Sequence, residues 1–381
     1  MKVLYILPSY SIYSGDNLSI LNLLIGLSQF NVEPLVVVSK KATFFSELEK
    51  FNIPYKVVLN DPTAYSPPCN NLKDSILFLW RLVKYSHRFR NSIKEISSIV
   101  KEFKPQIIHS NTGPTMSGYK ISRKYKIHHV WHIREYLDLD FQSRLLFSSK
   151  EHRRRLSERN NYAIAITKDL FHYYNLSAKD RVIYNGILKA GFARLTLNKK
   201  KYFLFVGRLT EKKGAGQLIK AFIKFTENDS DFQLLLAGGS VDQGYLDLLK
   251  EDVKQNKLEN RVFFLGERND VHDLMLFATA LIVPSAFEGF GRITAEAMFN
   301  GCLVIGNNSG GTKEILKENN AGVLYSSQEE LTSAMHAVIK NGIDYYYPII
   351  KKAQEQAVSL YSQERNASEV YKYYTEILRN N

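Results

Sequence analysis

Short apolar runs alternate with amphipathic stretches along this chain, most regularly after residue 200. The apolar runs of the first half fall at residues 3–7, 35–38 and 106–109. Those of the second half, most of them followed by glycine, fall at residues 202–206, 233–237, 262–265, 280–284 and 303–305. Such runs, separated by helical stretches, are typical of parallel strands covered on both faces. The pattern predicts an α/β fold of two doubly wound, Rossmann-like domains, with ligands at the carboxyl ends of the strands.

The boundary between the two domains is predicted near residue 190. Asn185 and Gly186 form a turn signal, and residues 189–201 are expected to be a hinge. We therefore predict an N-terminal domain over residues 1–190 and a C-terminal domain over residues 191–361. One or two amphipathic helices are expected at residues 72–103. Three further helices are expected at residues 327–341, 345–360 and 363–378, and the last has an apolar face.

The composition is that of a globular protein. The chain has 381 residues, 45% of them hydrophobic, and no apolar run approaches the roughly 18 residues that a membrane span requires. The first eight residues are interpreted as a buried strand, because they lack the small-residue cleavage site of a signal peptide. Two distant cysteines, Cys69 and Cys302, favour a cytoplasmic protein without a disulfide framework.

The net charge of +13 belongs almost entirely to the first half. Residues 1–195 hold 29 lysines and arginines against 15 acidic residues, whereas residues 196–381 hold 22 against 23. The cations gather in three clusters: Arg81, Lys84, Arg88 and Arg90; Arg123, Lys124 and Lys126; and Arg153, Arg154, Arg155 and Arg159. A basic half indicates an anionic partner, either a membrane surface or a nucleic acid, unless these cations only solvate helix faces.

Two carboxylates flank a glycine-rich turn in the second half. Glu288 and Glu296 lie eight positions apart, and Gly-Phe-Gly follows the first of them. If a strand ends before Glu288 and a helix begins near Arg292, the first amides of that helix are unpaired, partly positive and suited to a phosphate. These amides are those of Phe290, Gly291 and Arg292. The arrangement suits a nucleotide sugar, which is a diphosphate between two polyhydroxylated rings.

Two cations follow the first strand of the second domain. In the segment Val-Gly-Arg-Leu-Thr-Glu-Lys-Lys-Gly, Gly207 comes at the strand end, Arg208 directly after it, and Lys213 five positions later. Glycine allows close approach of the backbone, and two cations at the mouth of a parallel sheet neutralise a pyrophosphate. They would also stabilise the charge that builds on it as its bond breaks. The simpler alternative is a loop of exposed cations.

These segments resemble the motifs of the family-four retaining glycosyltransferases, which have the GT-B fold. The family pattern is G-R-L-x-x-x-K-G, a strand ending in P-S, E-G-F-G-x-x-x-x-E-A-M, and a G-G-x-x-E turn. This chain has each in order, at residues 207–214, 284–285, 288–298 and 310–314. The chain is thus similar to bacterial surface-polysaccharide glycosyltransferases. The family implies two domains that face a central cleft, and a last helix, about residues 362–381, that packs back on the N-terminal domain.

The resemblance implies roles for single residues. Arg208 and Lys213 would hold the donor diphosphate, beside Gly207, and stabilise the departing nucleotide. Glu296 would accept hydrogen bonds from the ribose hydroxyls. Glu288 would bind the transferred sugar or support positive charge at its anomeric carbon. The remaining donor contacts would come from Phe290, Gly291, Arg292 and, at the base, Arg268.

The N-terminal domain supplies further candidates. The family often has a Gly-Gly pair after the first strand, where this chain has Ser14 and Gly15. Gly15 is therefore the residue expected to reach the diphosphate or the acceptor. His132 stands where similar enzymes carry a histidine that contacts the transferred sugar, although its apolar neighbours also fit a packed core residue. Arg134 and Glu135 are expected to face the acceptor or to pair with each other.

No metal or other cofactor is expected. Asp138 and Asp140 look like the D-x-D metal motif of the other main glycosyltransferase fold. They lie, however, in a basic loop of a different architecture, and surface carboxylates are the simpler interpretation. No cluster of histidine, cysteine and acidic residues has metal-ligand spacing. The cations at the diphosphate are therefore expected to be Arg208 and Lys213.

The resemblance and the one-sided charge together imply a cytoplasmic retaining glycosyltransferase, peripheral at the inner face of the cell membrane. It would move a hexose or N-acetylhexosamine from a nucleotide diphosphate sugar, with UDP favoured, to a lipid-linked or glycan acceptor in cell-surface polysaccharide (capsule) synthesis. The basic first domain would bind an anionic membrane surface.

Three alternatives are open. The first is a related nucleotide-sugar epimerase or hydrolase with the same fold. The second is a nucleic-acid-binding protein, but the chain lacks zinc-finger spacing and an aromatic–glycine RNA-binding signature, so no nucleic acid is expected as a partner. A nicotinamide-dependent enzyme is disfavoured, because no G-x-G-x-x-G follows the first strand.

Overall fold

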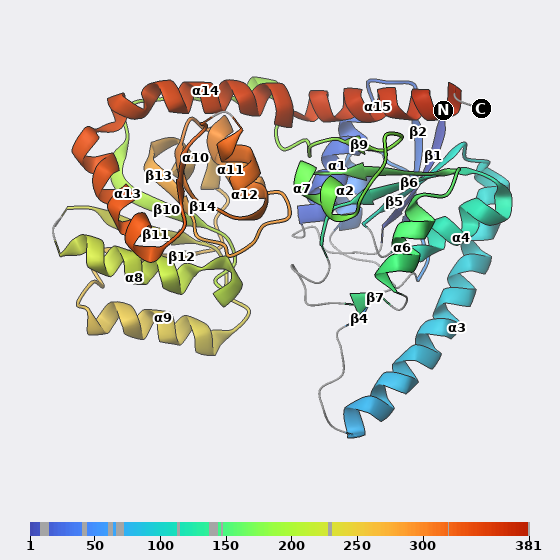
Figure 1. Cartoon of the computed structure of the whole chain (residues 1–381), viewed down its shortest axis with the longest axis horizontal. Coiled ribbons are helices and arrows are strands. Elements are labelled where there is room, and N and C mark those ends of the chain that lie inside the picture. Colours follow the sequence, from blue (N-terminus) through green and yellow to red (C-terminus); the bar gives the residue numbers. More distant parts are fainter. Residues whose placement is uncertain are drawn as a thin grey trace. The chain divides into compact units, whose positions relative to one another are not determined.

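The chain folds into two α/β units (Figure 1). The computed structural model describes residues 1–7, 15–39, 44–59, 64–65, 72–112, 115–136, 144–145, 148–227, 231–318 and 320–379. The first unit is Met1–Gly186 with Gln363–Asn381, and the second is Ile187–Ser362. The first division thus comes after Gly186, rather than after residue 190, and the chain returns to the first unit after Ser362.

The segment expected to be a hinge, residues 189–201, lies inside the second unit and is bonded to it. The Arg194 amide donates to the Phe299 carbonyl over 2.9 Å, and Gln354 Nε2 donates to the Arg194 carbonyl over 2.6 Å. The Arg194 guanidinium also pairs with Asp273 at 2.8 Å. These contacts fix the segment to the unit that follows it, which is why the division falls earlier in the chain.

Within the described residues, the sheet of the first unit has seven parallel strands in the order β3-β2-β1-β5-β6-β8-β9. They are β1 (Lys2–Leu7), β2 (Glu33–Val38), β3 (Tyr55–Val57), β5 (Ile107–Asn111), β6 (His128–Ile133), β8 (Asn161–Ala165) and β9 (Arg181–Val182). A separate antiparallel pair joins β4 (Ala64–Tyr65) and β7 (Arg144–Leu145). The strands expected in the first half are all present.

Helices cover both faces of this sheet. They are α1 (Gly15–Leu27), α2 (Phe44–Lys50), α3 (Leu72–Phe103), α4 (Met116–Tyr125), α6 (Ser149–Leu156), α7 (Lys168–Tyr173) and α15 (Gln363–Arg379). Apolar residues of α1, α2 and α15 form one core cluster with the strands, and those of α3 and α4 form another. Helix α15 packs closely on α1: a Cβ on Gly26, had the residue one, would lie only 2.7 Å from the Cβ of Ala367.

The six-stranded parallel sheet of the second unit has the order β12-β11-β10-β13-β14-β15. Its strands are β10 (Lys200–Val206), β11 (Gln233–Ala237), β12 (Val262–Gly266), β13 (Ala278–Val283), β14 (Leu303–Asn307) and β15 (Val323–Tyr325). The connecting elements are η1 (Ala190–Phe192), η2 (Glu211–Lys213), α8 (Ala215–Thr226), α9 (Gln243–Gln255), α10 (Val271–Phe277), α11 (Arg292–Phe299), α12 (Gly310–Lys317), α13 (Gln328–Asn341) and α14 (Ile343–Tyr361). The strand order reverses between β10 and β13, which is where doubly wound sheets bind their ligands.

The stretch expected to be one or two helices is a single helix of 32 residues, α3. Its sequence has neither glycine nor proline to interrupt it. In the part of the chain that the structure describes, no helix combines the length and the apolar character that crossing a membrane requires.

Candidate active site

Two loops meet at the carboxyl ends of β10 and β13. The first runs from Gly207 to Gly214, and the second follows β13. The amide of Ala286 donates to the carbonyl of Lys212 over 3.2 Å, which ties the loops together. Gly214 has a φ of 77°, and a Cβ there would overlap the carbonyl oxygen of Pro284. The last glycine of the first motif therefore permits the close approach of the two loops.

The approach brings Lys213 and Glu288 together. Lys213 Nζ lies 2.7 Å from Glu288 Oε1, and the two side chains are 31% and 20% exposed. The sequence placed a cation and a carboxylate at the site as separate groups, and the structure joins them as an ion pair. Both ends remain partly open to solvent, so a ligand can reach the cation and the carboxylate at the same point.

The Gly-Gly turn supports the loop that carries Glu288. The amide of Gly311, at the start of α12, donates to the carbonyl of Glu288 over 2.7 Å. A Cβ on Gly311 would overlap the backbone of Phe290, and Gly310 has a φ of 50°. The two glycines thus let α12 pack directly on the turn, so that the motifs at residues 288–298 and 310–314 contact each other through their backbones.

Helix α11 begins at Arg292, directly after Gly291, whose φ is 87°. The first amides of a helix lack intrahelical partners, as expected for the amides of Phe290, Gly291 and Arg292. One turn into the helix, Arg292 Nε pairs with Glu296 Oε1 at 2.8 Å, and the side chains are 21% and 12% exposed. The carboxylate expected at the ribose is therefore held by a neighbouring cation. One terminal nitrogen of Arg292 is buried with no partner among the described residues.

Arg208 and Arg268 differ in their surroundings. Arg208 follows Gly207 at the end of β10, is exposed, and forms no ion pair within the described ranges. Arg268 follows β12 and pairs with Asp270 at 2.6 Å. Strand β12 lies two places from β10 in the sheet, so Arg268 stands about 10 Å along the edge from the first loop. Arg208 is thus available to an anion, and Arg268 lies farther along the edge of the sheet.

His132 lies at the end of β6 in the first unit and is fully buried. Its Nδ1 lies 3.1 Å from His109 Nε2 and 3.3 Å from a terminal nitrogen of Arg134. His109 Nδ1 in turn lies 2.6 Å from the hydroxyl of Tyr374, on α15. His132 therefore belongs to a buried hydrogen-bond network that links β6, β5 and the last helix.

The hydrogen-bond donors around His132 and His109 determine the protonation of both imidazoles. Arginine has donors only, so His132 Nδ1 must accept, and the single proton of a neutral His132 then sits on Nε2. His109 consequently donates from its Nε2 and accepts the Tyr374 hydroxyl at its Nδ1. Burial, reinforced by the Arg134 cation, holds the pKa of both histidines well below the ordinary value, so both rings are neutral. His132 Nε2 is buried and has no partner among the described residues.

Arg134 holds this arrangement in place. Its Nε donates to Asn111 Oδ1 over 2.6 Å and its NH1 donates to Asn185 Oδ1 over 2.5 Å. Through these bonds the side chain connects the ends of β5 and β6 to the turn before the second unit; whether it also faces the acceptor stays a prediction. Sequence reasoning missed Asn111, Asn185, His109 and Tyr374, because their partners lie far away along the chain.

The remaining residues that the sequence singled out are Gly15, Ser14, Asp138 and Asp140. Gly15 begins α1, and its carbonyl accepts a hydrogen bond from the Ser19 hydroxyl over 2.7 Å. Ser14, Asp138 and Asp140 lie outside the described residues. Across the described ranges, no three histidine, cysteine or acidic side chains gather as metal ligands.

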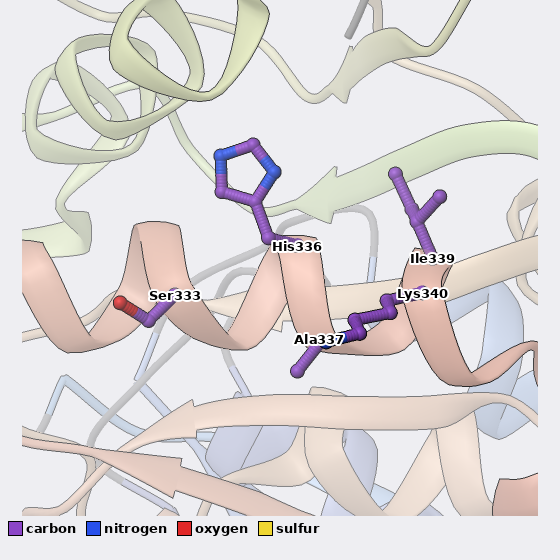
Figure 2. Close-up of a pocket in the computed structure, with 5 residues that line it drawn as sticks. All are labelled: Ser333, His336, Ala337, Ile339 and Lys340. Atoms are coloured by element: carbon purple, nitrogen blue, oxygen red, sulfur yellow. The ribbon is translucent and has the colours of Figure 1, made fainter. Parts of the chain in front are cut away.

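A hollow of about 530 Å³ lies along α13 (Figure 2). It is lined by Ser333, His336, Ala337, Ile339 and Lys340. These residues come from one helix, not from strand ends, and they offer no carboxylate to bind sugar hydroxyls. The hollow is therefore separate from the site at β10 and β13.

The buried histidines predict that the first unit loses stability in mild acid. Burial lowers the pKa of His129 to about 3 and that of His152 to about 4, and it acts in the same direction on His109 and His132. The unfolded chain binds protons below pH 6.5 that the folded unit excludes. Stability is therefore complete above pH 6.5 and falls as the pH drops toward 4, by about 1.4 kcal/mol per pH unit for each histidine.

Urea unfolding of a Trp80→Phe variant, followed through the emission of buried Trp131, measures this slope. Between pH 6.5 and pH 5 the change in unfolding free energy should come from the histidines. Hydrogen bonds from Arg154 and Arg155 lower the pKa of Glu151 to about 2, so this carboxylate affects stability only in stronger acid. The same slope is expected when exposed His87 is replaced by asparagine. An unfolding free energy that stays constant through this window would contradict the assignment of neutral buried histidines.

Comparisons with known proteins bear on the family and the fold. Residues 191–356 match the family model described as glycosyl transferases group 1. An uncharacterised glycosyltransferase of Methanocaldococcus jannaschii is 31% identical over 222 residues, which cover 52% of this chain and 55% of that protein. The Campylobacter jejuni N-acetylgalactosamine-N,N'-diacetylbacillosaminyl-diphospho-undecaprenol 4-alpha-N-acetylgalactosaminyltransferase is 27% identical over 43% of this chain and 45% of its own length. The chain thus spans about half the length of these curated relatives.

Solved structures match the whole chain. Anabaena HepE in complex with UDP gives a TM-score of 0.80 at 22% identity, over 99% of this chain and 100% of that one. The same protein in complex with UDP-glucose gives a TM-score of 0.76 at 22% identity over the same shares. At this level of identity the likeness establishes a shared fold.

Proposed function

Because residues 191–356 form a glycosyl transferases group 1 domain and the whole chain has the GT-B fold, we propose that this protein transfers a sugar from a nucleotide diphosphate sugar. The observation that carries the proposal is the junction of the loops after β10 and β13, where Lys213 and Glu288 lie 2.7 Å apart. The junction stands at the switch point of a doubly wound sheet. Its cation, its carboxylate and the first amides of α11 suit a diphosphate and sugar hydroxyls.

The proposed donor is a UDP-linked hexose or N-acetylhexosamine. The HepE structures hold UDP and UDP-glucose, which supports this choice. Arg208 and Lys213 would bind the diphosphate. Arg292 holds one oxygen of Glu296, and we assign the other oxygen to the ribose hydroxyls. To bind the base, Arg268 would exchange its contact with Asp270 for the ligand.

We propose retention of configuration through a front-face reaction. The bond between the anomeric carbon and the phosphate oxygen breaks while the acceptor oxygen bonds to the same face of that carbon. The leaving phosphate oxygen takes the acceptor proton. Arg208 and Lys213 stabilise the charge on the departing diphosphate, so no metal is assigned. The alternative, double displacement, needs a carboxylate nucleophile. Glu288 is already paired with Lys213, and we propose a different role for it, support of positive charge at the anomeric carbon.

His132 would contact the transferred sugar through its Nε2 proton, which has no partner among the described residues because Arg134 and His109 bond only to its Nδ1. The proposed acceptor is a lipid-linked or glycan molecule of cell-surface polysaccharide synthesis. The printed name of the Campylobacter relative, whose acceptor is a diphospho-undecaprenol, supports a lipid-held acceptor. A peripheral position at an anionic membrane surface follows from such an acceptor.

Thermal melting of the full chain with a panel of nucleotide sugars tests the proposal. A donor at about 100 times its Kd stabilises the fold by about 2.7 kcal/mol, so UDP-glucose, UDP-galactose or their N-acetylated forms should raise Tm, and NAD should not. A UDP-sugar that is bound but only hydrolysed or epimerised, with no transfer to lipid extracts, would favour the alternative activity. A Tm that no nucleotide sugar raises would overturn the proposal.

A further inference from the structure

Helix α3 has apolar residues on two sides, and only one side is packed on its own unit. Ile96 and Val100, in its C-terminal part, are buried in a core cluster with β1 and β5. Near its N-terminal end, four apolar side chains are half or more exposed: Ile76 (52%), Leu77 (50%), Trp80 (72%) and Val83 (65%). Figure 1 shows this end of α3 extending well beyond the other elements of its unit.

The four exposed residues form one continuous face. Successive residues of a helix are about 100° apart, so Trp80 and Val83 lie within about 40° of Ile76 around the axis. Leu77 widens the same face, and the four positions extend about 10 Å along the helix. Ile96 and Val100 lie on the opposite side by the same count. The face is therefore a second apolar surface and not an extension of the core.

Cations border this face over residues 76–94, and the nearest acidic residues of the helix are Asp74 and Glu95. Residues 76–94 include Arg81, Lys84, Arg88, Arg90 and Lys94 and contain neither aspartate nor glutamate. Arg81 and Lys84 stand one turn or less from Trp80 and are exposed. The combination of an aromatic anchor, aliphatic neighbours and flanking cations is typical of helices that lie in the interface of a bilayer.

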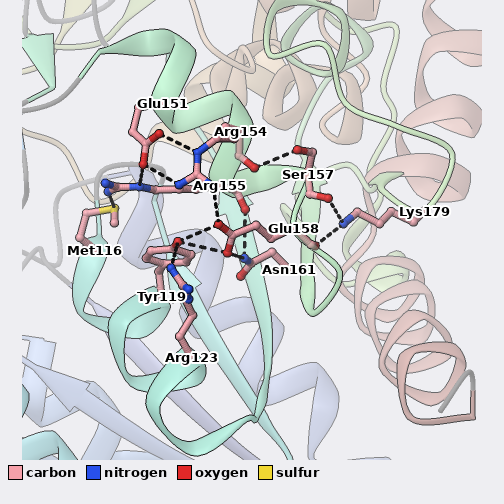
Figure 3. Close-up of polar contacts among 10 residues, drawn as sticks. All are labelled: Met116, Tyr119, Arg123, Glu151, Arg154, Arg155, Ser157, Glu158, Asn161 and Lys179. Carbon is pink, nitrogen blue, oxygen red and sulfur yellow. Dashed lines mark hydrogen bonds and ion pairs between the residues drawn. The ribbon is translucent and has the colours of Figure 1, made fainter.

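Two arginines of another basic cluster of the first unit are paired with carboxylates (Figure 3). Arg154 pairs with Glu151 at 2.7 Å and with Glu158 at 3.1 Å, and Arg155 pairs with Glu151 at 2.8 Å. Arg123 donates to the hydroxyl of Tyr119, which in turn donates to Glu158. In the sequence the basic clusters look equivalent. Within the described residues, however, Arg81 and Lys84 of α3 form no ion pair, unlike Arg154 and Arg155.

We propose that the face formed by Ile76, Leu77, Trp80 and Val83, the docking face of α3, inserts into the interface of an anionic lipid bilayer, with Arg81 and Lys84 at the head groups. The occupant is a bilayer because apolar insertion and a cationic border are needed together, and anionic lipid supplies both partners. The inference rests on the proposed function in one respect, since it names the surface that would bring the enzyme to a lipid-held acceptor.

The chain carries its own probe for this docking. Its two tryptophans are Trp80, on the docking face, and Trp131, which is fully buried. Vesicles of phosphatidylethanolamine with one quarter phosphatidylglycerol should shift the emission of Trp80 to shorter wavelength and carry the full chain upward in flotation. Vesicles of phosphatidylcholine alone should do neither, and added salt should weaken the binding.

Variants separate the face from the rest of the surface. Trp80→Ser with Val83→Ser should reduce partition to anionic vesicles more than tenfold, and Arg81→Gln and Lys84→Gln should each reduce it about fivefold. The matched control is Val241→Ser with Leu248→Ser, which removes two apolar side chains that are 81% and 66% exposed in the second unit. This control should float like the original chain.

Three results would overturn the docking face: no flotation of the original chain, flotation retained by Trp80→Ser with Val83→Ser, or a shift of Trp80 emission with protein concentration in the absence of vesicles, which would mark self-association. The rise in Tm with UDP-sugar should be the same in the docking variant. Donor binding without flotation therefore rejects the docking face alone, and flotation without donor binding rejects the proposed function alone.

Discussion

Replacing Lys213 by methionine should lower kcat/KM for sugar transfer about 100- to 1,000-fold, the range found when one charge-stabilising donor is removed from an active site. Lys213 is held at the loop junction by Glu288, 2.7 Å away, and is about one third exposed. It would bind the donor diphosphate and, more strongly, the charge that develops as the nucleotide departs, so the loss should be divided between weaker donor binding and lower kcat. Methionine keeps the unbranched stem and removes only the cation.

Initial rates of UDP release with the donor identified by melting measure this loss. Lys220→Met is the matched control, since Lys220 is an exposed lysine of α8 a short distance along the chain. Combining Lys213→Met with Glu288→Gln should cost less than the product of the two single effects, because paired groups are not independent. A rate within threefold of the original in Lys213→Met would remove the cation from the mechanism, and near-normal turnover in Glu288→Gln would remove any essential charge at Glu288.

Replacing Arg134 by methionine should destabilise the first unit and lower turnover together. The change leaves the side-chain oxygens of Asn111 and Asn185 without their donor, each at about 1–3 kcal/mol. It also releases Nδ1 of His132 from its obligatory acceptor role, so the ring no longer presents Nε2–H alone. Loss of the hydrogen bond that we propose from His132 to the transferred sugar, about 1 kcal/mol, should reduce kcat about fivefold.

Imidazole nitrogen NMR of the chain labelled with ¹⁵N-histidine separates positioning from stability. The original protein should show His132 and His109 protonated at Nε2 only, whereas Arg134→Met should show His132 as a mixture of tautomers. Arg134→Lys should not restore the original spectrum, since lysine cannot reach three acceptors in fixed directions. Arg181→Met, which breaks an exposed pair with Glu376, is the control and should cost less than about 1 kcal/mol. Unchanged nitrogen shifts and turnover, with reduced stability, would leave Arg134 a structural role only.

The fold could be predicted because its signals are local. Each apolar run in the second half is a strand of the doubly wound sheet, and the glycines after the strands mark the loops that carry the site. The loop after β10 and the loop after β13 could be found for the same reason, since each follows its own strand. That the two loops meet could also be predicted, because the carboxyl ends of parallel strands lie at the same edge of a sheet.

The side-chain partnerships could not be predicted, because they depend on three-dimensional register. Lys213 and Glu288 are 75 residues apart, and His109 and Tyr374 are 265 apart. Pairs within one helix are the exception: Arg154 and Arg155 with Glu151, and Arg292 with Glu296, have the i,i+3 or i,i+4 spacing that the sequence already shows. That spacing was the available signal that Arg154 and Arg155 are paired within their own helix.

The most direct test of the donor site is the rise in Tm that a UDP-sugar produces in the original chain, in Lys213→Met and in Lys220→Met. The site assigned to the loops after β10 and β13 predicts a full rise in the original chain and in Lys220→Met, and a rise reduced by more than half in Lys213→Met. An equal rise in all three proteins would contradict the account, because the donor would then bind somewhere that Lys213 does not reach.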